Sequence, residues 1–153
     1  MSHLKRMTIT AIVAFALTLT SLTVNAQMTI VDASATETIG ELSPMGQTVI
    51  SITKAGDIYT FSYRDSKFTH IDEFKSFNMN EESFNGLYNT IQSNIDKAPK
   101  EPITLTFENG IISLHFIKLL GVKSVQIYHS KTGDVIGTTS WITKKQLDKL
   151  FRG

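Results

Sequence analysis

The sequence predicts an α+β domain in which a curved antiparallel sheet of about seven strands packs on one central helix, with a short C-terminal helix. Two observations lead to this class. Turn signals separate runs of alternating apolar residues, and one apolar stripe has helical spacing. The connections are also short enough for antiparallel pairing. A small β-barrel capped by the C-terminal helix is the alternative.

The first part of the chain has the pattern of an export signal. Two basic residues precede the uncharged segment Met7–Thr23, and a small-residue cleavage site ends at Ala26. We therefore expect a signal peptide over residues 1–26, one domain over residues 27–153, and an address in the periplasm or outside the cell. A membrane anchor is the other interpretation, but the segment is shorter and richer in Thr and Ser than a span requires. After processing we expect no integral membrane segment.

Composition excludes several classes of protein. The chain has 153 residues, no cysteine, and 15 Lys plus Arg against 14 Asp plus Glu. A disulfide scaffold and a thiol nucleophile are therefore impossible. The balanced charge also argues against a nucleic-acid partner that is bound by bulk positive charge.

Strand signals begin after an exposed strand or loop expected over residues 27–47. Thr48–Lys54 and Asp57–Tyr63 alternate apolar and polar residues on either side of Ala55 and Gly56, which predicts a hairpin with a two-residue turn. In that register the facing apolar pairs are Ile52 with Tyr59 and Ile50 with Phe61. A further strand is predicted over Phe68–Phe77.

A helix is predicted from Asn80, because Asn is a favourable N-cap and the two glutamates that follow suit the positive end of a helix. Its apolar residues recur at helical spacing, namely Phe84, Leu87, Tyr88, Ile91 and Ile95. Pro99 and Pro102 mark the end of this element.

The second half contains two further hairpin signals. Asn109-Gly110 between Ile103–Glu108 and Ile111–Ile117 predicts a two-residue turn. The expected facing pairs are Phe107 with Ile112, Leu105 with Leu114, and Ile103 with Phe116. The next hairpin joins residues 123–129 to residues 134–141 through the loop 130–133.

A short helix follows the last predicted strand. Thr143 and Gln146 have the spacing of a capping box, and Leu147, Leu150 and Phe151 would dock the helix. Its lysines and arginine form a basic side, which is either a solvated face or a surface for an acidic partner, and these residues are Lys144, Lys145, Lys149 and Arg152.

No local motif identifies a reaction. The histidines after the leader are His70, His115 and His129, and only His70 and Asp72 have a spacing that places two metal ligands on one face of a strand. One such pair is a weak signal, so we expect no metal, no cofactor and no catalytic residue. Isolated histidines on strands are ordinary polar-face residues.

The aromatic residues suggest a surface. Most of them fit the predicted core, but those near strand ends can line a concave face of the sheet. The candidate ligand or partner surface consists of Tyr63, Phe68, His70, Asp72, His115 and Trp141.

The sequence-based hypothesis for function is an exported, soluble, non-catalytic binding protein, such as an inhibitor, an immunity-type protein or an accessory factor, with a protein partner in the cell envelope. A structural envelope-associated domain is one alternative. A small hydrolase that uses Asp72, Glu73 and His70 as acid and base is another, since such a site needs no local motif.

Overall fold

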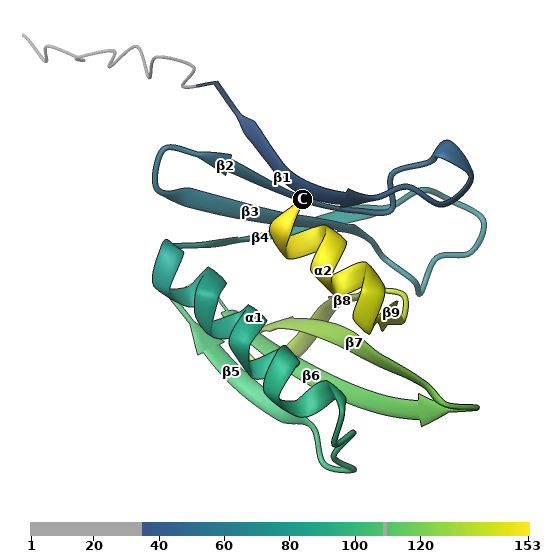
Figure 1. Cartoon of the computed structure of the whole chain (residues 1–153). Coiled ribbons are helices and arrows are strands. Elements are labelled where there is room, and N and C mark those ends of the chain that lie inside the picture. The colour runs from purple at the N-terminus through teal and green to yellow at the C-terminus, as the bar shows by residue number, and fades with distance from the viewer. Residues whose placement is uncertain (1–34, 109) are drawn as a thin grey trace, which may run out of the picture. The chain divides into compact units, whose positions relative to one another are not determined.

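The computed structural model describes residues 35–108 and 110–153, which form two antiparallel sheets and two α-helices (Figure 1). The signal peptide predicted over residues 1–26 lies outside the described residues. In chain order the elements are β1 (Glu37–Leu42), a 3-10 turn (Pro44–Gly46), β2 (Ile50–Ala55), β3 (Ile58–Arg64), β4 (Phe74–Met79), α1 (Glu81–Ile95), β5 (Ile103–Phe107), β6 (Gly110–Leu119), β7 (Val122–Lys131), β8 (Asp134–Thr138), β9 (Ile142–Thr143) and α2 (Lys144–Arg152).

The strands form two separate sheets. The first has four strands in the order β1-β2-β3-β4, and the second has five, with β5-β6-β7-β8 in sequence and β9 paired to β7. The α+β class is therefore confirmed. The single sheet of seven strands is wrong, because α1 follows β4 and the chain then begins a new sheet at β5. The closed barrel is also wrong, since the two sheets do not join.

The β2–β3 hairpin keeps the predicted faces but not the predicted partners. Ile52 pairs with Phe61 and Ile50 pairs with Tyr63. The turn residues are Gly56 and Asp57, and Gly56 has a φ of 58°, which glycine adopts at low cost. Because side chains alternate with a period of two, a two-residue shift leaves every side chain on its own face. Hydrophobic alternation cannot distinguish these two registers.

The β5–β6 hairpin shows the same difference. Ile103 pairs with Leu114, Leu105 with Ile112, and Phe107 with Gly110. Gly110 is thus the first residue of β6 and not part of the turn. The apolar face is again as predicted, since the shift is two residues.

The β7–β8 hairpin is tighter than predicted. Its turn is Thr132-Gly133, with φ values of 54° and 93°, and Lys131 pairs with Asp134. Two successive positive φ values are typical of a two-residue type I′ turn. The strand after it ends at Thr138, and an irregularity in the ladder follows His129.

The strand predicted over residues 68–77 begins only at Phe74. Residues 65–73 form a loop that Asp65 closes, because its backbone N–H donates to the Glu73 carbonyl at 2.8 Å. The buried Asp65 carboxylate accepts hydrogen bonds from the Lys67 and Thr138 backbone N–H groups, both at 3.1 Å. Since Thr138 belongs to β8, this loop ties the first sheet to the second.

Both helix starts are confirmed. The Asn80 side chain accepts a hydrogen bond from the Ser83 backbone N–H at 2.8 Å. Thr143 and Gln146 form the predicted capping box, in which each side chain bonds the backbone N–H of the other. These caps satisfy N–H groups that have no partner within the helix.

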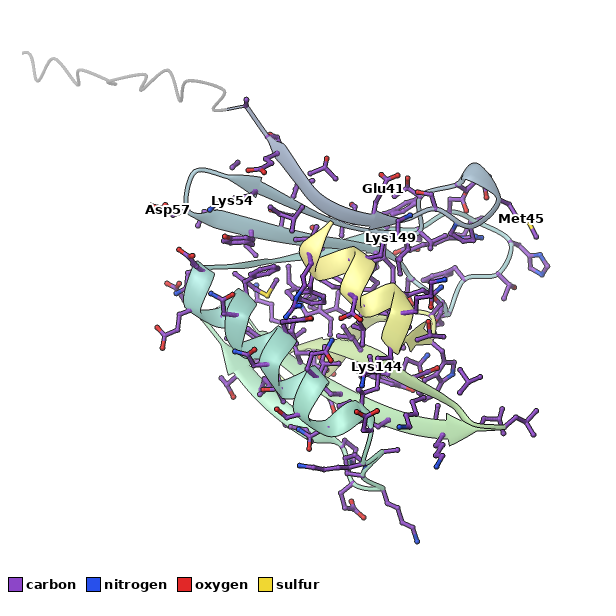
Figure 2. All side chains as sticks on the ribbon, viewed as in Figure 1. Glu41, Met45, Lys54, Asp57, Lys144 and Lys149 are labelled. Carbon is purple, nitrogen blue, oxygen red and sulfur yellow. The ribbon has the colours of Figure 1, made fainter. Side chains whose placement is uncertain are left out.

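One apolar core is shared by both sheets and both helices. Ring stacking links Tyr59 of β3 to Phe84 of α1, and Phe84 to Phe151 of α2, with centroid distances of 4.3 and 5.3 Å. Helix α2 lies directly on β1 at Gly40, and Lys149 is the helix residue over this strand (Figure 2). The core therefore holds α2 close to the sheet edge.

Candidate functional site

The end of the β6–β7 hairpin exposes a group of large apolar side chains. Leu120 is 95% exposed, Leu119 63%, Val122 53%, Trp141 44% and Ile117 37%. Together with Ser124 they line a groove of about 350 Å³. We call these six residues the hairpin-tip surface. Scattered exposed hydrophobic residues are ordinary, whereas these side chains line one groove, which makes them the candidate site.

Strand alternation explains why these side chains point away from the core. Val125 pairs with Phe116 and packs inward, so the next rung, Ile117 with Ser124, faces outward. Two rungs further, Leu119 and Val122 face outward as well. Trp141 joins them because it directly precedes β9, whose Thr143 pairs with Ser124.

The tip is a two-stranded ribbon. β5 pairs with β6 only as far as Leu114, and β9 pairs with β7 only at Ser124 and Val125. Among the described residues, the last two rungs therefore have no strand on either side. Figure 1 shows this hairpin running past the end of α1. The apolar side chains project where no neighbouring strand covers them.

The turn itself is unfavourable for its sequence. Leu120 and Gly121 have φ values of 50° and 82°. Left-handed backbone is readily adopted by Gly and tolerated by Asn, but it is rare for leucine. An exposed leucine in this conformation contributes neither packing nor turn stability. Leu120 is therefore both exposed and held in a conformation that few leucines adopt.

Lysines surround the hairpin-tip surface. Lys118 and Lys123 face each other across the ladder on the side opposite the leucines. Lys123 and Lys144 bind the two carboxylate oxygens of Asp96 at 2.8 and 2.7 Å, and these hydrogen bonds lower the pKa of Asp96 to about 2. Lys118 and Lys145 are exposed and add uncompensated positive charge.

The structure places His115 on the second sheet and Trp141 directly before β9. His115 lies on the same outward face of β6 as Ile117, and its ring packs against Tyr128 with a centroid distance of 4.3 Å. Trp141 is part of the hairpin-tip surface. The sequence signal for the remainder of this surface is the apolar run Leu119-Leu120-Gly121-Val122, where a hairpin turn normally carries polar residues.

Phe68, His70 and Asp72 lie on the loop 65–73 and do not line the groove of the hairpin-tip surface. Phe68 lines a separate hollow of about 300 Å³ with Arg64 and Ser140. His70 is exposed. Asp72 forms an ion pair with Arg64 at 2.9 Å, and Glu73 is paired with Lys75. The two carboxylates that a hydrolase mechanism would use are thus each held by a cation.

Tyr63 is fully buried beneath the first sheet, since β3 turns it toward the core. Its hydroxyl lies 3.2 Å from Nδ1 of the buried His129 on β7. Burial, assisted by the nearby Asp65 carboxylate, raises the pKa of Tyr63 above its ordinary value. His129 also borders a hollow of about 350 Å³ between β4 and β8, lined by Lys75, Asn78 and Lys131 among others.

The buried histidine makes stability dependent on pH. Burial lowers the pKa of His129, so the folded state binds a proton less readily than the unfolded chain. The stability that the neutral His129 side chain contributes is present above about pH 6.5, the pKa of histidine in the unfolded chain. It is lost as the pH falls below that value toward the lower pKa of the folded state. Urea unfolding from about pH 8 to pH 5 measures the loss. We expect H129Q to flatten this acid limb and H70Q, at an exposed histidine, to retain it. An unchanged slope in H129Q would contradict the assignment.

Within residues 35–108 and 110–153, no three His, Asp or Glu side chains are placed to share a metal ion. In the same part of the chain, no helix is long and apolar enough to cross a bilayer. No family model, no curated protein and no solved structure matches the chain. The site is therefore interpreted from its own geometry.

Proposed function

We propose that this protein is a non-catalytic binding protein that acts through the hairpin-tip surface. The observation that carries the proposal is Leu120, which is almost fully exposed and held in left-handed backbone at the end of a two-stranded ribbon. Exposed apolar area of this kind costs free energy in water. That free energy is recovered only when a partner covers the area.

The residues that line this surface support a binding role and not a catalytic one. The groove has one polar lining residue, Ser124, and no titratable side chain. A catalytic cleft requires an acid, base or nucleophile in reach of the substrate. Lys118 and Lys123 form the rung next to Leu119 and Val122, and their positive charge suits recognition of negative charge.

A site-specific capture experiment tests the proposal. The tagged wild type and L120N are incubated with an extract of the cells that produce the protein, and the bound material is compared quantitatively. Asn accepts left-handed backbone, so L120N removes the apolar contact while leaving the turn at least as stable. The matched control is V135N. Val135 is another exposed apolar residue, and it lies on β8 beside the end of β7 that is far from the hairpin tip.

We expect one or more components to be retained by the wild type and V135N and reduced at least tenfold by L120N, because burying a leucine side chain contributes roughly 2 kcal/mol. Thermal unfolding of each variant confirms that the fold is intact. Bound material that is identical for the wild type and L120N would overturn the proposal.

A further inference from the structure

We propose that the occupant of the hairpin-tip surface is an anionic phospholipid bilayer, into which the tip inserts shallowly. This inference rests on the proposed function and names the class of partner. Three features of the tip carry it: its convex apolar end, the lysines behind that end, and the indole at its side.

The apolar end is convex. Leu119 and Val122 flank the turn Leu120-Gly121, and among the described residues no strand flanks this end of the ribbon. Such an end can enter a flat, deformable surface to a shallow depth without a complementary cavity. The gain then scales with the apolar area removed from water, as it does for interfacial helices.

The lysines stand at the depth where lipid headgroups would lie. Lys118 and Lys123 are one rung behind the leucines, and Lys144 and Lys145 begin α2 beside Trp141. Asp96 holds the ammonium groups of Lys123 and Lys144. Lys118 and Lys145 are exposed, so their alkyl stems can lie along apolar surface while their ammonium groups reach the headgroups. Each free lysine close to an anionic bilayer strengthens binding about fivefold.

The acidic groups at this end leave the positive charge in excess. Asp96 is held by Lys123 and Lys144, so these three residues together keep one positive charge. The segment after α1 adds two lysines and one glutamate, namely Lys97, Lys100 and Glu101. Asp148, one turn into α2, offsets one of the remaining positive charges, and Lys118, Lys145 and the two lysines after α1 still outnumber the acidic groups. Charge complementarity therefore favours an anionic surface over a neutral one.

The third feature is Trp141, which is half-exposed at the side of the apolar end. Indole combines a large apolar body with one N–H donor, and this combination suits the boundary between hydrocarbon and headgroups. Trp141 is also the single tryptophan of the chain. Its fluorescence therefore reports on the tip and not on the N-terminal segment.

The test uses sedimentation with phosphatidylcholine vesicles that contain either no anionic lipid or about one third phosphatidylglycerol, with Trp141 emission followed in parallel. We expect binding to the anionic vesicles only, a blue shift of the emission, and weakening as salt is raised. L120N should bind at least tenfold more weakly, K118Q and K145Q about fivefold each, and V135N like the wild type.

The wild type and all variants share the same N-terminal segment, so a difference between them arises at the tip. Equal binding to both vesicle types, an unshifted Trp141 emission, or wild-type binding by L120N would each overturn the lipid assignment. If L120N nevertheless loses a captured protein in the extract experiment, the proposed binding function stands with a protein partner. If neither experiment depends on Leu120, both proposals fail.

Discussion

Replacing Gly40 with alanine is expected to lower the free energy of unfolding by about 2–3 kcal/mol, because the new methyl group has no space. A Cβ at this position would fall 2.5 Å from the carbonyl oxygen of Lys149 and still closer to that of Leu150. Both obstacles are backbone atoms of α2, so no side-chain rotation relieves the overlap. Helix and strand must move apart instead.

The displacement would reach the core, since α2 carries Leu147, Leu150 and Phe151 into it. Urea unfolding followed by far-UV circular dichroism measures the loss as a lower midpoint. The matched control is G86A. Gly86 lies within α1, where an added Cβ meets nothing within 4 Å.

Alanine in an exposed helix interior is preferred over glycine by about 1 kcal/mol, so G86A should raise the midpoint. The two substitutions are chemically identical and have opposite expected signs. Equal effects would show that the close contact between α2 and β1 does not determine stability.

Removing the Asp65 carboxylate is the second large effect expected. D65A leaves the backbone N–H groups of Lys67 and Thr138 without their acceptor, and we expect a loss of about 2–3 kcal/mol. D65N retains one oxygen acceptor and should lose less. The same urea titration distinguishes the two variants.

The control for Asp65 is D57A, at an exposed aspartate in the β2–β3 turn (Figure 2). A surface change of this kind usually alters stability by less than about 0.5 kcal/mol. If D65A is as mild as D57A, the loop 65–73 does not contribute to joining the two sheets.

The sequence predicts those parts of the fold that depend on residues close together in the chain. Asn80 and Thr143 cap their helices as expected, because a cap depends on the three residues that follow it. The apolar faces of the hairpins are also as expected. The partner of each residue is not, since registers two residues apart bury the same side chains and only the turn separates them.

The loop 65–73 could not be predicted in this way. Its closing aspartate bonds Thr138, which lies 73 positions further along the chain. The division into two sheets depends on contacts of the same long range. Of the hairpin-tip surface, the sequence predicts Trp141 as an aromatic residue near a strand end. Leu119 and Leu120 fall between the predicted strands 111–117 and 123–129, where no alternation assigns them to either face.

The contact between β1 and α2 also determines when the domain can finish folding during synthesis. Gly40 emerges from the ribosome early, whereas the helix backbone that covers it is more than a hundred residues behind. Until α2 has emerged, the part of the first sheet at β1 lacks the helix that covers it, and partly made chains expose that apolar surface. The core therefore reaches its full packing only after the last helix has been made.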